Sequence, residues 1–312
     1  MSTNYQYQYQ ICLDMEQIGE RSCENLEGFK PLTILMQIIG ATLIILVIIW
    51  CGNYRGGFAW NSNPELEFNW HPLLMVIGFV FLYANGMLIY RTQRNARKQK
   101  LKLIHASLML LTIALVVISL VAVFDSHNLN LKPIPNMYSL HSWIGLTRIT
   151  LIDYFYIKMQ IYLLAIYGID FNYPRVLLNA NDTADEICTV YESDAIIITT
   201  IGSRDLEWLA GFLSFLYPKL QISLRTSYMP IHVYFGIAGF IGVITSCLLG
   251  LNEKAIFALK ENYFKLVDEA ILINVIGFLL ILFGGLSVYL VTQERYKRFA
   301  KLEDEALVNR TQ

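Results

Sequence analysis

Four of the five histidines lie near the ends of apolar segments that contain no Asp, Glu, Lys or Arg: His71, His105, His141 and His232. An ionisable side chain inside a bilayer is costly and indicates a functional site. Histidine is also a frequent axial ligand of haem iron. Two such residues near each membrane face predict two haem groups, each held by two histidines and stacked across a membrane.

The composition is that of a membrane protein. Of the 312 residues, 55% are hydrophobic and only 16% are charged, whereas soluble domains carry about 25% charged residues. The net charge of −1 gives no overall field for binding nucleic acid, so no nucleic-acid partner is expected. The five cysteines are scattered and form no CxxC pair, which argues against a disulfide framework or a zinc site.

Five segments are apolar and long enough to cross a lipid bilayer, which takes about 20 residues. They are residues 31–50, 71–90, 103–124, 228–251 and 270–292, and a sixth must begin within residues 137–146. The basic residues between 91 and 102, and those from 295 to 301, are expected to face the cytosol. We therefore predict an all-α integral membrane protein with both termini cytosolic. Its fold would be a six-helix bundle around two stacked b haems, with an insert that disrupts the fourth span.

The predicted topology decides which histidines pair. Spans that start on the outer side begin with His71 and His141, whereas spans that start on the cytosolic side begin with His105 and His232. Both axial ligands of one iron must lie at one depth, because each nitrogen stands about 2 Å from the metal. The outer haem is thus assigned to the first pair and the cytosolic haem to the second. Pro72 and Pro230 are expected in the first turns of their helices, where a missing N–H costs nothing.

Short strings around these histidines resemble those of the cytochrome b561 family. In chain order they are YRGGFAW (54–60), FNWHP (68–72), IHA (104–106), FDSHN (124–128), MYSLHSW (137–143), MPIHVY (229–234) and GLNEK (250–254). The resemblance covers roughly residues 31–147 and 205–300. It implies a transmembrane oxidoreductase with two b-type haems, ascorbate as the cytosolic donor, and ferric iron or monodehydroascorbate as the acceptor on the other side. It also implies a homodimer.

The resemblance assigns an ascorbate site to four basic residues on the cytosolic side: Arg91, Lys98, Lys102 and Arg225. Ascorbate is a monoanion, so cations near the haem edge would hold it. The alternative is that residues 91–102 form only the basic cytosolic loop of a membrane protein. Lys102 lies three residues before His105, on the same helix face, which favours the functional interpretation. Arg225 lies seven residues before His232, about two helical turns away.

Near the outer face, the resemblance points to an acceptor site formed by His127, Asn128 and Tyr138. We expect His127 in a loop. There it would bind a ferric complex or take up the proton that accompanies the electron, since the pKa of a free imidazole lies near neutrality. The alternative is an exposed loop histidine without a task. The mechanism would be electron transfer alone, relayed by the haems, so no catalytic nucleophile or general base is required.

The chain departs from the family pattern after residue 146. About 58 residues, roughly 147–204, separate the two halves of the expected fourth helix. Around this insert we expect a cytosolic N-terminal tail (1–30), a transmembrane domain (31–292) and a cytosolic C-terminal tail (293–312). Three outcomes are open. The insert loops out of a split helix, or residues 149–169 complete the span instead, or the protein does not assemble both haems.

Two other functions are compatible with the sequence. The insert would make the chain a catalytically impaired member of the family, or the histidines would serve proton or metal passage in a six-span transporter. A transporter predicts charged residues at mid-membrane, and the five clear spans contain none. Plasma membrane, endosome, lysosome and secretory vesicle are all compatible locations, since no retrieval or lipidation motif is evident in residues 304–312.

Overall fold

The computed structural model describes residues 26–60, 62–146 and 222–298, and the regular structure in these ranges is helical. Five segments in them are long and apolar enough to cross a membrane: Phe29–Tyr54, Pro64–Thr92, Lys98–Asn128, Tyr228–Leu259 and Asp268–Thr292. The prediction of an all-α integral membrane protein with these spans is confirmed. The predicted sixth span begins as a helix at residues 140–146. Its continuation, with the whole insert, lies outside the described residues.

Three of the spans each consist mainly of one long α-helix. These helices are α6 (Lys98–Asn128), α9 (Ile222–Leu259) and α11 (Asp268–Thr292). The first span, α2 (Phe29–Ile49), ends in a π-helical turn, η1 (Trp50–Tyr54). Two short helical turns, α10 (Glu261–Phe264) and η4 (Glu294–Tyr296), flank α11 in the chain.

The second span is assembled from several pieces. The short helix α3 (Pro64–Glu67) is capped by the Asn63 side chain, which accepts hydrogen bonds from two backbone N–H groups. It leads into α4 (Trp70–Met75), the π-helical segment η2 (Val76–Leu82) and α5 (Tyr83–Thr92). π-Helical turns are rare and are frequently found at functional sites. This one begins five residues after His71, at Val76.

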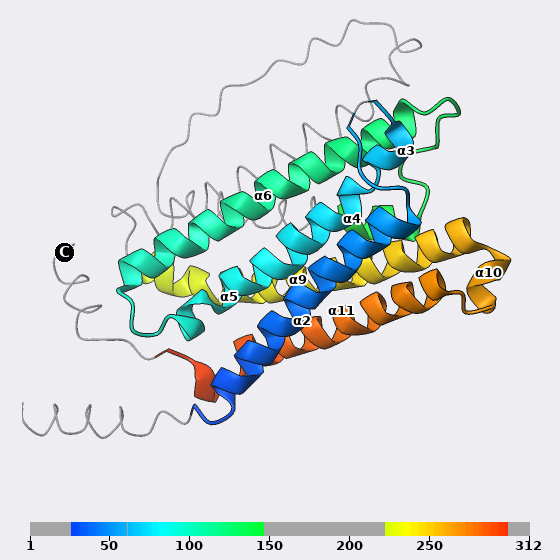
Figure 1. Ribbon diagram of the computed structural model, residues 1–312. Helices are drawn as coiled ribbons and strands as arrows, with labels where there is room; N and C mark the ends of the chain where they lie inside the picture. Colours follow the sequence, from blue (N-terminus) through cyan, green and yellow to red (C-terminus); the bar gives the residue numbers. More distant parts are fainter. Residues whose placement is uncertain (1–25, 61, 147–221, 299–312) are drawn as a thin grey trace, which may run out of the picture.

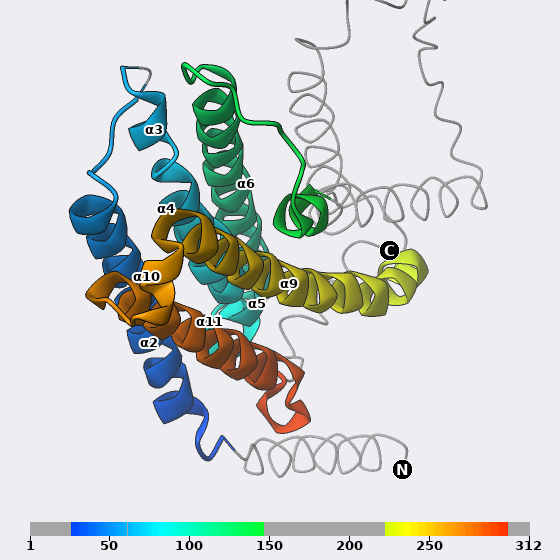
Figure 2. The ribbon, with the colours of Figure 1, turned by 90° about the vertical axis from the view of Figure 1, so that its right-hand side faces the viewer.

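The helices pack side by side in a bundle (Figure 1). In the chain, α6 follows α5 and packs back along α4, η2 and α5, while α11 packs against both α2 and α9. Seen along the bundle, α2 and α11 lie together on one side of α4 and α5, and α6 lies on the other (Figure 2). The second span is therefore central, and half of its most apolar window is buried.

The centre of the bundle is a single apolar cluster contributed by α2, η2, α9 and α11. At Gly40, α2 comes close to two aromatic rings. A Cβ atom there would stand 2.5 Å from Phe81 and 2.8 Å from Phe283, so only glycine permits this approach. Large apolar side chains on the opposite faces are exposed, among them Ile38, Ile45 and Phe278. Such faces fit a hydrocarbon environment rather than water.

Two local predictions are wrong, both because the helices extend beyond their apolar cores. Pro230 lies inside α9, which begins eight residues earlier at Ile222, so it is not a first-turn proline. His127 lies in the last turn of α6 rather than in a loop, since the helical hydrogen bonds continue to Leu129, whose N–H donates to the carbonyl of Asp125. Polar residues at the ends of both helices keep the backbone ladder intact outside the apolar stretch.

Candidate functional site

The four predicted membrane histidines meet in two pairs. His71 from α4 faces His141 from the helix at 140–146, with ring centroids 6.0 Å apart and ring planes at 83°. His105 from α6 faces His232 from α9, again with centroids 6.0 Å apart, at 70°. The same separation recurs in both pairs, although they share no residue and no helix.

This separation fits a metal between the rings. Two iron–nitrogen bonds of about 2 Å place the two ligating nitrogens roughly 4 Å apart, and half of each imidazole ring accounts for the rest of the 6.0 Å between centroids. Direct ring stacking or a hydrogen bond between the imidazoles would bring them closer. The residues present therefore fit a haem iron with two axial histidines at each site.

The hydrogen bonds of the rings select the nitrogen that is free to bind a metal. Nδ1 of His105 stands 2.9 Å from the carbonyl oxygen of Gly86, and Nδ1 of His141 stands 2.8 Å from that of Ser246. Nδ1 of His71 faces the carbonyl of Ser119 at 3.3 Å. A carbonyl only accepts, so in these three rings the proton is assigned to Nδ1 and Nε2 is left as the ligand.

A serine hydroxyl reinforces each histidine of the predicted outer pair, His71 and His141, in the same way. Ser119 Oγ lies 2.9 Å from Nδ1 of His71 and donates to the carbonyl of His71. Ser246 Oγ lies 3.2 Å from Nδ1 of His141 and donates to the carbonyl of His141. Each serine thus fixes both the ring and the backbone of its histidine. Sequence reasoning missed these two residues.

Two helices independently place the two pairs at opposite ends of the bundle. On α6, fourteen residues separate His105 from Ser119, the partner of His71. On α9, fourteen residues separate His232 from Ser246, the partner of His141. Fourteen residues of α-helix span about 21 Å. The hydrocarbon core of a bilayer is about 30 Å thick, so each pair lies towards one of its faces.

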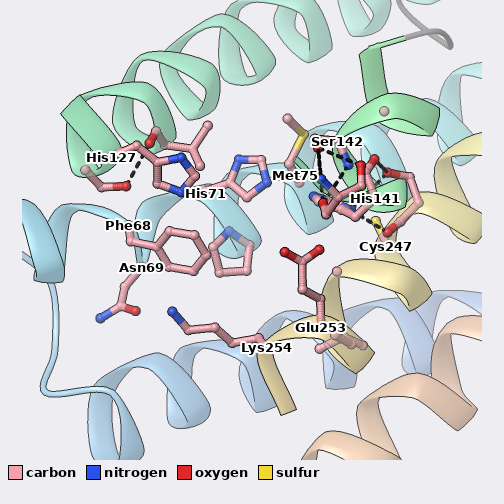
Figure 3. A pocket seen from close by; sticks show the side chains of 18 of the residues that line it. Phe68, Asn69, His71, Met75, His127, His141, Ser142, Cys247, Glu253 and Lys254 are labelled. Atoms are coloured by element: carbon pink, nitrogen blue, oxygen red, sulfur yellow. Dashed lines mark hydrogen bonds between the residues drawn. The ribbon is translucent and has the colours of Figure 1, made fainter. Parts of the chain in front are cut away.

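A cavity of about 690 Å³ opens beside the outer pair (Figure 3). Ligand and cofactor pockets usually measure about 300–1,000 Å³. Apolar side chains from α4, η2, α6 and α9 line most of it, and its polar lining includes His71, His141, His127, Glu253 and Lys254. The cavity therefore joins the outer histidine pair to the predicted acceptor residues.

Two of the predicted acceptor residues, His127 and Tyr138, line this cavity, and the third is linked to His127 through Asn136. His127 Nδ1 lies 3.0 Å from Oδ1 of Asn136, and the amide of Asn136 donates to the side chain of Asn128 at 2.9 Å. Partial burial and a hydrogen bond with the Glu253 carboxylate raise the pKa of Tyr138 to about 12. Asn136, which sequence reasoning missed, links two residues that it had singled out.

The predicted ascorbate residues lie at the other end. Arg91, at the end of α5, donates to the carbonyl of Gln293, beyond α11. Lys98 and Lys102 lie in the first turns of α6 and are half-buried. Arg225 is in the first turn of α9, but its side chain lies outside the described part of the chain.

The segment after α11, residues 294–298 (the strap), connects several parts of the chain at this basic end. Arg94 donates to the carbonyls of Tyr296 and Lys297 at 2.7 and 2.8 Å, and Arg298 donates back to the carbonyl of Arg94 at 3.1 Å. The hydroxyl of Tyr296 donates to the carbonyl of Glu27 at 2.9 Å. The strap therefore ties the loop before α6 to the start of α2.

Membrane-length helices that bring two imidazole pairs to opposite ends define a class: multi-pass membrane proteins whose histidines can hold a redox cofactor. A family model described as eukaryotic cytochrome b561 matches residues 70–169 and 195–258. Over 271 residues, 87% of this chain and 86% of the relative, the chain is 35% identical to the transmembrane ascorbate-dependent reductase CYB561 of Homo sapiens. The chain belongs to the cytochrome b561 family, which implies b-type haem as its cofactor.

A second kind of relative is similar to nearly the same extent. The plasma membrane ascorbate-dependent reductase CYBRD1 of Xenopus tropicalis is 34% identical over 288 residues, which are 90% of this chain and 82% of that protein. The match to the family model leaves out residues 170–194, which lie inside the predicted insert.

Proposed function

We propose that this protein transfers electrons across a membrane, from cytosolic ascorbate through two b-type haems to an acceptor on the outer side. His105 and His232 would hold the cytosolic haem, and His71 and His141 the outer haem. The acceptor would be ferric iron or monodehydroascorbate. Relatives of both kinds are named as ascorbate-dependent reductases, which supports ascorbate as the donor.

The observation that carries this proposal is the repeated geometry of the histidine pairs. Each pair has its ring centroids 6.0 Å apart, and the spacing along α6 and α9 places the pairs about 21 Å apart along the helix axes. When bound, haem supplies the one-electron chemistry. The chain contributes the ligating nitrogens, holds their orientation through Ser119, Ser246 and Gly86, and excludes water with its apolar lining.

At the cytosolic end, Lys98, Lys102, Arg91 and Arg225 would attract the ascorbate anion. Lys102 is the strongest candidate for direct contact because it lies one turn before His105 on the same helix. At the outer end, His127 would bind the acceptor or take up a proton, with Asn128 and Tyr138 as further acceptor contacts. Asn136 would hold His127 in place.

The cellular context is part of the proposal. Both termini would be cytosolic, because the basic loop before α6 and the basic strap after α11 lie at one end of the bundle. The protein would act as a homodimer in the plasma membrane or in an endosomal, lysosomal or secretory-vesicle membrane. The domains would be those expected from the sequence: tails 1–30 and 293–312 around a transmembrane domain 31–292 with an insert near 147–204.

The test is to purify the full chain in detergent, quantify haem per polypeptide and record ascorbate-reduced minus oxidised spectra. Two b haems per chain, both reducible by ascorbate, are expected. A chain without haem would refute the proposal. One haem per chain, or haem that ascorbate cannot reduce, would favour the alternative of an impaired family member. In that case deletion of residues 147–204 should restore the second haem.

A further inference from the structure

Lys254 brings a positive charge into the outer cavity from α9 (Figure 3). Its ammonium nitrogen lies 3.9 Å from the centre of the Phe68 ring. Among the described residues, no carboxylate lies within ion-pair distance of this nitrogen. The side chain is half-buried, so its charge lies in a largely apolar cavity, with an aromatic ring as its direct contact.

An ammonium group removed from water is unfavourable unless an anion accompanies it. The cation–π contact with Phe68 replaces only part of the lost hydration. A cavity with this cation therefore fits a ligand that brings its own negative charge.

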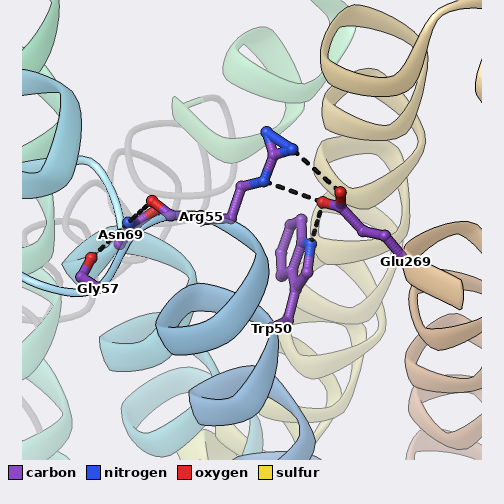
Figure 4. Close-up of polar contacts among 5 residues, drawn as sticks. All are labelled: Trp50, Arg55, Gly57, Asn69 and Glu269. Atoms are coloured by element: carbon purple, nitrogen blue, oxygen red, sulfur yellow. Dashed lines mark hydrogen bonds and ion pairs between the residues drawn. The ribbon is translucent and has the colours of Figure 1, made fainter.

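The second cation of the cavity, Arg55, is already paired. Its Nε lies 2.9 Å from Oε1 of Glu269 on α11, and its terminal nitrogen donates to Oε2 at 3.2 Å. The indole N–H of Trp50 donates to the same carboxylate at 2.9 Å (Figure 4). Arg55 is thus neutralised and fixed against α11. Among the lining residues that the structure describes, this leaves Lys254 as the Lys or Arg side chain available to a ligand.

The two carboxylates that act on the charge of Lys254, those of Glu253 and Glu269, are engaged with other side chains. Glu253 precedes it on α9 and is hydrogen-bonded with Tyr138 at the mouth of the cavity. Glu65 lines the cavity from α3. Neither Glu253 nor Glu65 forms an ion pair with Lys254 by distance.

We propose that Lys254 binds a propionate carboxylate of the outer haem and raises the reduction potential of that haem. The proposal rests on the proposed function, since it requires a haem between His71 and His141. Haem b carries two propionates, and a fixed positive charge beside it favours the reduced state, which has one positive charge less than the oxidised state. Lys254 therefore makes the outer haem a better electron acceptor.

The experiment compares three variants of the full chain with the wild type by spectroelectrochemical titration in detergent, without ascorbate or acceptor. Lys254→Met removes the charge and keeps much of the side-chain volume, and Lys254→Arg keeps the charge. Lys265→Met is the matched control, because Lys265 is exposed in the turn before α11, outside the cavity lining. Haem content is measured for every sample.

For Lys254→Met we expect the reduction equilibrium of one haem to shift at least tenfold towards the oxidised form, about 59 mV for a one-electron couple. The other haem, the Lys254→Arg variant and the Lys265→Met variant should stay close to the wild type. Selective loss of one haem in Lys254→Met, with full haem content in Lys254→Arg, would support the same contact.

Three results would overturn the inference: unchanged potentials in Lys254→Met with both haems bound, an equal shift in Lys265→Met, or equal haem loss in both Lys254 variants. Unchanged potentials together with a higher KM for anionic ferric chelates would assign Lys254 to the acceptor instead. A wild-type chain without two haems would refute the proposed function itself, so the two failures are distinguishable.

Discussion

Gly250 of α9 lies directly against the imidazole of His141. A Cβ atom at Gly250 would stand 2.9 Å from both Cε1 and Nδ1 of the ring, closer than packed carbon atoms approach. The ring cannot move away freely, because its Nδ1 is bonded to the carbonyl of Ser246 at 2.8 Å. The glycine is therefore required for the position of the histidine, not for the flexibility of the helix.

The variant Gly250→Ala should consequently lose the outer haem. The added methyl group pushes His141 out of line with His71, whereas the cytosolic pair is about 21 Å away along the helix and should stay intact. We expect haem content to fall from two towards one per chain, as measured by pyridine haemochrome against protein concentration. Gly285→Ala on α11 is the control, since a Cβ there meets nothing within 4 Å. Full haem content in Gly250→Ala would contradict this assignment of His141.

Ser119 and Ser246 give a second prediction, in which their effects differ. Partners of metal-bound histidines typically contribute about 10- to 100-fold to metal affinity. Ser119→Ala should weaken retention of the outer haem more than Ser246→Ala. The reason is that His71 would keep only a 3.3 Å contact with a carbonyl, whereas His141 keeps one of 2.8 Å.

The measurement is the rate of haem transfer from each variant to an excess of a haem-scavenging protein. Ser287→Ala on α11 serves as the control, because that hydroxyl bonds only the carbonyl of Phe283 one turn before it. If Ser246→Ala released haem faster than Ser119→Ala, the hydroxyl of Ser119 would not be the main support of His71.

Most of the fold could be predicted from the sequence, since apolar runs of about 20 residues leave few alternatives to a membrane span. The ends of the helices could not be predicted in this way. Residues 98–102 and 125–128 are polar except for Leu101, yet they continue α6, because each further residue adds a backbone hydrogen bond. Hydropathy carries no information about that bond, so His127 was expected in a loop.

The candidate site was predictable only in part. Topology indicates which histidines meet, and the spacing of fourteen residues from His105 to Ser119 and from His232 to Ser246 is a repeat that would have pointed to both serines. Gly86 could not have been found, because its backbone carbonyl is the acceptor and any residue type has one. Asn136 reaches His127 only through the fold of the loop after α6.

The buried pair between Arg55 and Glu269 gives a prediction about stability. The two side chains are 20% and 10% exposed, so Glu269→Gln leaves a largely buried guanidinium without its counter-charge. Breaking a fully buried pair costs roughly 3–5 kcal/mol, and the partial exposure of this pair should place the loss somewhat below that range. The unfolding midpoint in detergent should fall for Glu269→Gln and change little for Asp268→Asn, the exposed neighbour. Equal midpoints would show that the pair contributes no net stability.

Tyr138 should not be responsible for any pH dependence near neutrality. Its pKa is raised from 10 to about 12 by partial burial and the hydrogen bond with Glu253, so the phenol keeps its proton well above neutral pH and loses it only as the pH rises through about 12. Tyr138→Phe should therefore lower acceptor reduction without changing the shape of the rate profile from about pH 6 to about pH 9. A profile that changes shape would mean that the phenol exchanges its proton in that range.

His127 and Asn136 provide the prediction that separates the two ends of the protein. Asn136 Oδ1 accepts from His127 Nδ1 at 3.0 Å and fixes the ring at the mouth of the outer cavity. His127→Gln and Asn136→Leu should both slow the oxidation of the prereduced protein by an acceptor, the first more strongly, because the histidine acts directly and the asparagine only positions it. Neither should change haem content or the rate of reduction by ascorbate, since the proposed donor site is at the other end of the bundle. Stopped-flow spectroscopy measures both half-reactions separately.

Slower reduction by ascorbate in either variant would contradict this assignment. It would mean that the substitution disturbs the structure of the whole bundle, and His127 would then have a structural role rather than a role in acceptor reduction.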